Sequence, residues 1–421
     1  MLNGGALVSI LKAIYRFMLK LVSPALDMRS SLCISRVKKR HDNVSPDRMR
    51  VAFLVFEPET WDKQEPVYEE LLKHDDIQVD VVVVPSFNGS FSVGSSYGEE
   101  RVFFEKTCER VVLAYNEHGE LIDMSTDPYD YVFYGDSYNR HMPGSLRSYE
   151  LVKHSKICYI PYGFSGSAVF DSIADNREFY RNVYFGFTDS FQKAESFKKA
   201  FSKNCSRGLQ HFEYLGYPIL ERYLAAKKNV SKDAASVSWT PRWSYDKVIG
   251  GSHFLEYRED FLELGQKYNV DLTLRPHPMM FEEFSKKGLM PKDEIDRYLE
   301  RLERRDVELS KNEPITDVLL RTDILITDYS SIIIMFFLTG RPIIYCEGSI
   351  PFNESFESLK AGMYIAQNWD EVDRHLRDIL KGNDYLAETR RAIIRREFDG
   401  LKGSSERIVK RLCDDFYRRD M

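Results

Sequence analysis

Short apolar runs that alternate with helical segments constrain the fold of this chain more than any other sequence feature. Residues 51–56 read Val-Ala-Phe-Leu-Val-Phe, which predicts a buried strand, and helical spacing follows over residues 62–73. Further strands are predicted at 79–84, 131–134, 157–160 and 183–187. Strands that alternate with helices indicate a mostly parallel sheet with helices on both faces, which is an α/β fold.

The alternation begins again after a crossing near residues 216–218. This second series predicts strands at 237–239, 270–274, 324–327 and 342–346, with helices between them. In a chain of 421 residues, two such series predict two doubly wound parallel-sheet domains that face a cleft. We expect an arm over 1–47, an N-terminal domain over 48–218, and a C-terminal domain over 219–421 whose last helix packs back on the first domain.

Composition narrows the set of partners. The formal net charge of −6 is unlike the basic balance of proteins that track nucleic acid, so we expect no nucleic-acid partner. The six cysteines lie far apart, without a C-x-x-C pair, which indicates reduced thiols in the cytoplasm. No acidic cluster has the spacing of metal ligands, and we expect neither a metal nor another cofactor.

The arm contains an interrupted apolar segment over residues 6–26. Lys12, Arg16 and Lys20 recur every four residues and form one stripe on a helix, opposite a broad apolar face. Three charges at mid-depth would each cost about 2.5 to 3.5 kcal/mol, which argues against a spanning helix. The pattern suits a helix in a membrane interface, so we expect a cytoplasmic protein that is peripheral on the inner face of the cell membrane. An amphipathic helix packed on the protein itself is the alternative.

The stretch from Asp323 to Ser331 reads Asp-Ile-Leu-Ile-Thr-Asp-Tyr-Ser-Ser and leads directly into an apolar helical run. A buried strand therefore ends at a polar corner where a helix begins. Ser330 and Ser331 would offer hydroxyl donors there, beside unpaired N–H groups that favour an anion such as a diphosphate. The alternative is that Asp328 and Ser330 only cap the helix.

Arg275 and His277 follow the predicted strand 270–274 in the sequence Arg-Pro-His-Pro. The two prolines fix φ near about −65° and limit the backbone freedom of the imidazole. The guanidinium of Arg275 matches phosphate geometry, and His277 as a cation would neutralise charge on a leaving nucleotide. A structural or exposed role is the alternative for a single loop histidine.

Arg242 follows the predicted strand 237–239 within Ser-Trp-Thr-Pro-Arg-Trp and is expected to face the same cleft. The flanking Trp239 and Trp243 leave a structural stacking role as an equal alternative. His253, in Gly-Gly-Ser-His, is a further candidate for a contact with the nucleotide.

These three motifs, Trp-Thr-Pro-Arg-Trp, Arg-Pro-His-Pro and Ile-Thr-Asp-Tyr-Ser-Ser, resemble in the same order those of the CDP-glycerol glycerophosphotransferase family, which builds teichoic-acid-like polymers. The resemblance extends over residues 235–350. It implies the GT-B fold and a CDP-glycerol or similar nucleotide donor, with an N-terminal acceptor domain over 48–218 and a C-terminal nucleotide-donor domain over 219–421. It also implies that the donor diphosphate is held by Ser330, Ser331 and His277, with Asp328 and Arg242 nearby.

The N-terminal half departs from the pattern of this family at one position. Members carry a histidine in a Trp-His-Gly motif after a strand, where it is thought to activate the acceptor hydroxyl. The matching residues here are Ile-Pro-Tyr162-Gly, and a tyrosine with a pKa of about 10 is a poor base at neutral pH. Either Tyr162 shapes the pocket, or Asp136 or His141 in the loop after strand 131–134 supplies the base. The alternative for that loop is an ordinary polar surface.

The resemblance implies a transferase that moves glycerol phosphate, or a related alditol phosphate, to a lipid-linked or polymeric glycan or polyol-phosphate acceptor and releases CMP. A glycosyltransferase of the same fold, which uses a nucleotide sugar in capsule or cell-surface polysaccharide synthesis, is the alternative because the family histidine is missing. A binding or scaffold protein that keeps the donor site but lacks a base is a second alternative.

Overall fold

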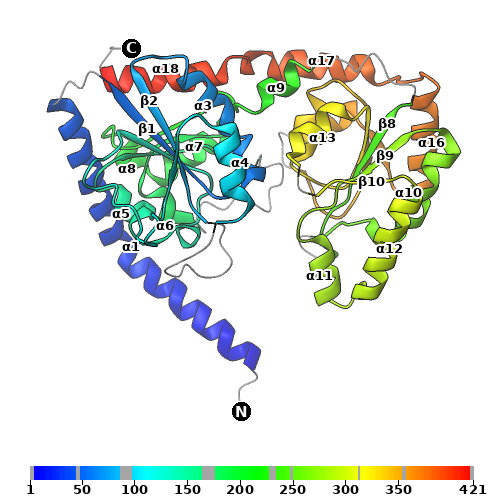
Figure 1. Cartoon of the computed structure of the whole chain (residues 1–421), viewed down its shortest axis with the longest axis horizontal. Coiled ribbons are helices and arrows are strands. Elements are labelled where there is room, and N and C mark those ends of the chain that lie inside the picture. Colours follow the sequence, from blue (N-terminus) through cyan, green and yellow to red (C-terminus); the bar gives the residue numbers. More distant parts are fainter. Residues whose placement is uncertain are drawn as a thin grey trace.

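The computed structural model describes residues 4–43, 48–85, 97–163, 176–226, 234–246, 250–311, 313–352 and 357–417, without the side chains of 4–20, 42, 43 and 399. These residues form two α/β domains that lie side by side, and a long N-terminal helix projects from the first (Figure 1). Each domain is built on its own parallel sheet, so the predicted fold class is confirmed.

The first domain has a seven-stranded sheet in the order β3-β2-β1-β4-β5-β6-β7, in which every neighbouring pair is parallel. Its strand order reverses between β1 and β4. The strands are β1 (Met49–Val55), β2 (Ile77–Val83), β3 (Val111–Leu113), β4 (Tyr131–Tyr134), β5 (Lys156–Tyr159), β6 (Val183–Phe187) and β7 (His211–Glu213). The helices include α2 (Pro58–Trp61), α3 (Glu65–Leu71), α4 (Glu99–Thr107), α5 (Ser148–Leu151), α6 (Arg177–Tyr180), α7 (Phe191–Ala200) and α8 (Ser202–Cys205).

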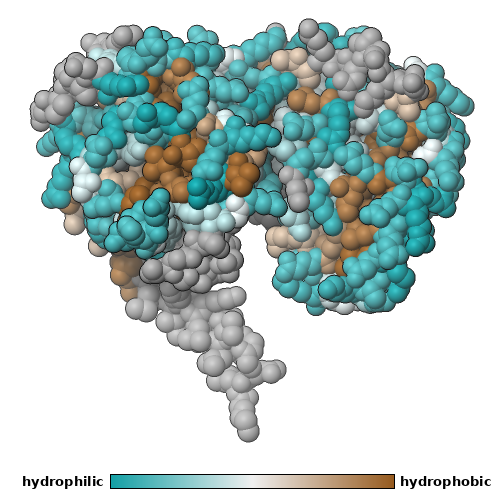
Figure 2. All heavy atoms as spheres, viewed as in Figure 1, coloured by the Kyte–Doolittle hydropathy of each residue, from teal (hydrophilic) through white to brown (hydrophobic). Residues whose placement is uncertain are grey.

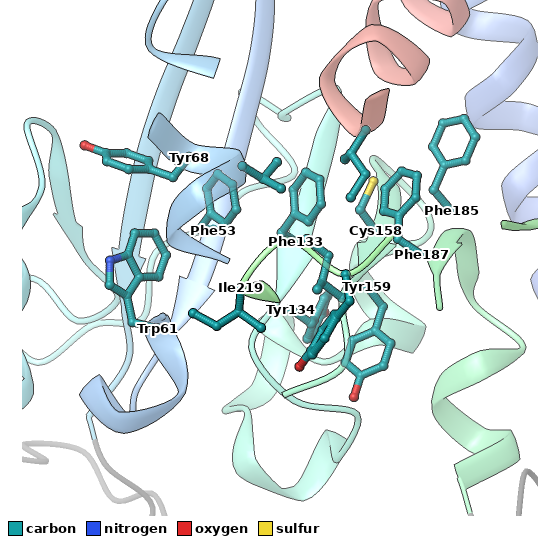
Figure 3. Close-up of a cluster of buried hydrophobic side chains, with 14 of the residues drawn as sticks. Phe53, Trp61, Tyr68, Phe133, Tyr134, Cys158, Tyr159, Phe185, Phe187 and Ile219 are labelled. Atoms are coloured by element: carbon teal, nitrogen blue, oxygen red, sulfur yellow. The ribbon is translucent and has the colours of Figure 1, made fainter. Parts of the chain in front are cut away.

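Aromatic side chains from neighbouring strands form the core of this domain (Figure 3). Phe53 on β1 stacks on Phe133 on β4 with ring centroids 4.8 Å apart, and Trp61 meets Phe53 edge-on at 5.6 Å. Phe187 on β6 continues the stack 6.3 Å from Phe133. Strands buried on both faces read as continuous apolar runs, which explains why the sequence indicated them.

The second domain has a six-stranded parallel sheet in the order β10-β9-β8-β11-β12-β13, which reverses between β8 and β11. Its strands are β8 (Ser236–Thr240), β9 (Asp271–Leu274), β10 (Glu308–Leu309), β11 (Ile324–Thr327), β12 (Ile343–Cys346) and β13 (Tyr364–Ala366). Its helices include α10 (Phe254–Tyr268), α11 (Met280–Lys286), α12 (Lys292–Arg304), α13 (Ile315–Arg321), α14 (Ile332–Phe337) and α16 (Trp369–Leu380).

The chain crosses between the domains at α9 (Leu220–Leu224) and again between α17 (Ala387–Phe398) and α18 (Ser404–Tyr417), which run along the same side of the molecule (Figure 1). The helix α18 returns to the first domain. There Asp415 accepts hydrogen bonds from Lys156 at 2.5 Å, Tyr131 at 2.6 Å and Tyr184 at 2.8 Å. These partners offset the cost of burying the carboxylate.

The N-terminal helix α1 (Gly4–Asn43) is longer than the sequence indicated. Its second half packs on the first domain, where Ser30 donates to Asn182 at 2.7 Å and Lys38 donates to the carbonyl of Gly208 at 2.9 Å. The side chains of Lys12, Arg16 and Lys20, which carried the predicted cationic stripe, lie outside the described residues. Within the described part of the chain, no helix has the length and apolar character needed to cross a membrane.

His211 on β7 makes the stability of the first domain depend on pH. Burial, with Arg411 adding to it, lowers the pKa of His211 to about 4. The unfolded side chain binds a proton below pH 6.5, so unfolding takes up a proton between pH 6.5 and 4 and acid destabilises the fold. Lowering the pH from 7 to 5 should therefore cost the wild type about 1 to 2 kcal/mol more than His211→Phe, measured by urea unfolding. Equal losses in both proteins would contradict this assignment.

Candidate active site

A cavity of about 700 Å³ lies between the two domains. Figure 2 shows the notch that separates the domains on the surface. The wall of the cavity includes residues that follow β4 and β5 in the first domain and β8, β9 and β11 in the second. The carboxyl ends of both sheets therefore face the cavity. Ligands of doubly wound folds bind at this edge, at the point where the strand order reverses.

Ser330 and Ser331 form the corner between β11 and α14, and both line the cavity. The hydroxyl oxygen of Ser330 accepts from the N–H of Ile332 at 3.4 Å, which leaves its own hydrogen available to another acceptor. Because α14 has only six residues, its dipole is small. Attraction for an anion at this corner therefore depends on the hydroxyls and on the neighbouring arginines, more than on the helix.

Arg242 places a fixed positive charge on the cavity wall. The backbone N–H of Arg242 donates to Asp328 Oδ2 at 2.8 Å, and the side-chain Nη1 donates to the carbonyl of Tyr329 at 3.2 Å. The guanidinium also lies over the ring of Tyr329, 5.2 Å from the centroid. Burial lowers the pKa of Arg242, but a guanidinium remains charged at neutral pH.

Asp328 is fully buried and lies behind the cavity wall. Besides the N–H of Arg242, its carboxylate accepts the backbone N–H of His253 at 3.2 Å and the ring Nδ1 at 2.7 Å. Burial opposes the protonation of His253, but its hydrogen bond to Asp328 raises the pKa. His253 lines a separate cavity of about 650 Å³ with Tyr257 and Ser349. From this buried position the carboxylate of Asp328 holds the backbone of Arg242.

Arg275 and His277 reach the cavity from the loop after β9. The Nη1 of Arg275 donates to Ser310 at 2.9 Å, and its backbone N–H donates to the carbonyl of Trp239 at 2.9 Å. His277 opens onto the cavity, but limited hydration and the charges of Arg242 and Arg275 lower its pKa to about 4. The side chain is thus neutral at pH 7, not the cation expected from the sequence. Its Nδ1 accepts from the N–H of Met279 at 3.2 Å, so the neutral ring carries its proton on Nε2.

Tyr162 lines the cavity from the first domain with 41% of its surface exposed. Burial of the hydroxyl, with Tyr138 next to it, raises the pKa of Tyr162. A phenol with a raised pKa is less suited to accept a proton at neutral pH than an ordinary tyrosine.

Asp136 and His141 form a pair on the loop after β4, outside the cavity lining. Asp136 Oδ2 contacts His141 Nδ1, and Asp136 Oδ1 accepts from the N–H of Tyr138 at 3.0 Å. The other ring nitrogen of His141 accepts from Arg140 at 3.0 Å. Both ring nitrogens of His141 and both carboxylate oxygens of Asp136 are therefore engaged.

Two polar residues at the cavity edge escaped the sequence reasoning. Lys193, in the first turn of α7, lines the cavity. Glu57 lies two residues after the end of β1, is exposed, and precedes Glu59, which lines the cavity. The only sequence signal for Glu57 is its place right after the apolar run 51–56, and many surface carboxylates share that feature.

Comparison with known proteins relates the second domain to one family. Residues 215–413 match the family model described as CDP-glycerol:poly(glycerophosphate) glycerophosphotransferase. The teichoic acid ribitol-phosphate polymerase TarK of Staphylococcus aureus is 30% identical over 181 residues, which are 40% of this chain and 31% of that protein. The polymerase TarL of the same organism is 29% identical over 39% of this chain and 28% of its own length. The match thus spans less than a third of either relative.

Solved structures resemble the whole chain. The wall teichoic acid polymerase TagF, in a variant soaked with CDPG, has a TM-score of 0.56 at 14% identity and covers 98% of this chain and 99% of its own. The UDP-GlcNAc 2-epimerase of Neisseria meningitidis, bound to UDP-GlcNAc, has a TM-score of 0.54 at 11% identity over 87% of this chain and 100% of its own. At these identities the likeness concerns the fold alone, and the predicted GT-B-like architecture is confirmed.

Proposed function

We propose that this chain, whose residues 215–413 match the CDP-glycerol:poly(glycerophosphate) glycerophosphotransferase family model, moves an alditol-phosphate unit from a CDP-alditol to a polyol-phosphate or glycan acceptor and releases CMP. One observation carries the proposal. Five side chains suited to a diphosphate line the same cavity although they come from three loops that are far apart in the sequence: Arg242, Arg275, His277, Ser330 and Ser331.

The proposed chemistry follows from the charges and donors of these residues. A diphosphate would lie against the guanidinium groups of Arg242 and Arg275, which match phosphate geometry. The Nε2–H of His277 would donate to an oxygen of the leaving CMP and offset the charge that develops there. An acceptor hydroxyl attacks the distal phosphorus, and most of the rate enhancement comes from positioning and these donors.

One observation favours a second candidate, a glycosyltransferase that uses a nucleotide sugar. Tyr162 stands where the family carries its histidine, so attack on phosphorus lacks the usual base at this position. The two candidates differ in the nucleotide they bind. A thermal shift with CDP-glycerol and CDP-ribitol, but not with UDP-sugars, would favour the alditol-phosphate transferase.

Transfer of label from donor to acceptor tests the proposal. Purified protein would be incubated with CDP-glycerol or CDP-ribitol labelled in the alditol, together with a lipid-linked polyol-phosphate acceptor. We expect label in the lipid fraction that depends on both protein and acceptor. Failure with every CDP-alditol would remove the substrate assignment.

We further propose that the outward face of α1 holds the protein on a membrane surface that presents a lipid-linked acceptor. Leu21, Met28 and Leu32 are 66%, 64% and 52% exposed, and their spacing places them on one face of the helix. Arg29 and Arg36 are exposed on the same stretch. An apolar stripe flanked by cations is typical of a helix that lies on anionic lipid.

Replacing Met28 and Leu32 together by glutamate is expected to reduce co-sedimentation with phosphatidylglycerol vesicles at least tenfold, because two apolar contacts are lost and two anions face the lipid. Val102→Glu is the matched control, since Val102 is 67% exposed on α4, away from this face. Undiminished vesicle binding by the double variant would contradict this orientation of α1.

A further inference from the structure

The point of strand reversal in the first domain holds a group of acidic and imidazole side chains without an assigned role. In the second domain the corresponding point, between β8 and β11, carries Arg242 and the serine corner. In the first domain it lies between β1 and β4 and carries Glu57, Asp136 and His141. Ligands of doubly wound sheets bind at such points. The donor and the acceptor of a transfer reaction could therefore each bind at the switch point of one domain.

The register of the two strands brings Glu57 and Asp136 to the same edge. Leu54 pairs with Tyr134, and the N–H of Gly135 donates to the carbonyl of Leu54 at 3.2 Å. Glu57 and Asp136 each follow two residues after the last residue of their strand. Both segments run into the cavity wall, which includes Glu59 and Ser137.

Aromatic packing ties the two loops together. The ring of Phe56, the residue before Glu57, meets the ring of His141 edge-on at 5.7 Å. Asp136 is buried and engaged with His141 and the N–H of Tyr138, whereas Glu57 is exposed. Of the three titratable side chains in this group, Glu57 is the one that is exposed, and it lies two residues before Glu59 of the cavity wall.

We propose that Glu57 accepts the proton of the acceptor hydroxyl, with Asp136 as a positioning residue that is held by His141. The assignment rests on the proposed transfer reaction. Glu57 would supply the base that Tyr162 does not provide. It follows β1, which is the neighbour of β4, the strand that Asp136 follows.

The proposed step is balanced without a further reactant. The O–H bond of the acceptor breaks, and the proton moves to a carboxylate oxygen of Glu57. The acceptor oxygen forms a bond to the distal phosphorus of the donor while the bond from that phosphorus to the bridging oxygen breaks. The bridging oxygen keeps the electron pair and leaves as part of CMP, and Glu57 later releases its proton to water.

Electrostatics support this role. Although Glu57 is exposed as a whole residue, partial burial of its carboxyl group, followed by the charges of Asp136 and Glu59, raises the pKa of Glu57 to about 7. A general base is most effective when its pKa lies near the working pH, since it is then both deprotonated and basic. Asp136 thus acts on Glu57 as a nearby like charge, while His141 and the N–H of Tyr138 keep its carboxylate in place.

Glu57→Gln is expected to lower kcat for CMP release about 100- to 1000-fold, with KM for the donor within twofold of the wild type. The wild-type rate should fall below pH 7 with one ionisation, and the residual rate of the variant should lack this limb. Asp136→Asn should move the limb to lower pH, because a like charge is removed. Glu57→Asp should restore part of the rate. Glu117→Gln, an exposed glutamate away from the cavity, should match the wild type.

A kcat for Glu57→Gln within threefold of the wild type, in a protein with unchanged melting temperature, would overturn the assignment. Failure of the proposed function would look different, because the wild type itself would release no CMP from any CDP-alditol. In that case, an NMR titration of the carboxyl ¹³C of Glu57 still tests whether this side chain is a base with a pKa near 7. A midpoint near pH 7 that falls in Asp136→Asn supports the poised base, and a midpoint below pH 5 overturns it.

Discussion

His277→Ala is expected to lower kcat for CMP release about 100- to 1000-fold, the loss typical when one donor to a developing negative charge is removed. His277 presents its Nε2–H to the cavity because Nδ1 accepts from the N–H of Met279. Because His277 has a pKa of about 4, its ring is neutral at pH 7 and donates through Nε2–H without first taking up a second proton. The measurement is the initial rate of CMP formation at saturating CDP-alditol.

His375→Ala is the control for this substitution, since His375 lies on α16 outside the cavity. His277→Asn should recover part of the lost rate, because its amide keeps an N–H donor. A His277→Ala enzyme with a rate within threefold of the wild type would show that the leaving group is stabilised elsewhere.

Asp328→Ala is expected to lower the free energy of unfolding by about 3 kcal/mol or more and to abolish donor binding. The substitution leaves the buried backbone N–H of Arg242 and two part-buried donors of His253 without their acceptor. Arg242 would then lose its fixed position at the cavity. Urea unfolding and titration calorimetry with CDP-glycerol measure the two effects.

The exposed Asp317 on α13 provides the matched control, and Asp317→Ala should change neither quantity by more than about 0.5 kcal/mol. Asp328→Asn should lie between the two, because one carbonyl oxygen remains to accept the N–H of Arg242. Wild-type donor affinity in Asp328→Ala would contradict the positioning role of the carboxylate.

Much of the fold is predictable because central parallel strands are buried on both faces. The runs that became β1, β4 and β11 are mostly apolar, and the sequence marks each of them. The strand β8 is buried throughout although it contains two serines and a threonine. Edge strands lack this signal. The strand β7 begins with His211 and ends with Glu213, and the two-residue β10 is partly exposed.

Long-range contacts and protonation states could not be predicted from the sequence, because they depend on residues that are far apart in the chain. The bond from Tyr131 to Asp415 joins residues 284 positions apart, and no local pattern indicates it. The lowered pKa of His277 comes from burial and then from the charges of Arg242 and Arg275, and Arg242 lies on the loop after a different strand, β8. The position of Arg242, His277 and Ser330 after predicted strands was readable, but the burial of Asp328 and the setting of Glu57 required the packed loops.

The identity of the nucleotide released tests the central claim most directly. Chromatography of the products from CDP-glycerol, CDP-ribitol and a polyol-phosphate acceptor separates CMP from CDP and from uncleaved donor. Formation of one CMP per alditol phosphate incorporated is the expected result, since the bond to the distal phosphorus is the one that breaks. Release of a nucleoside diphosphate from a nucleotide sugar, with no CMP from either CDP-alditol, would contradict the account.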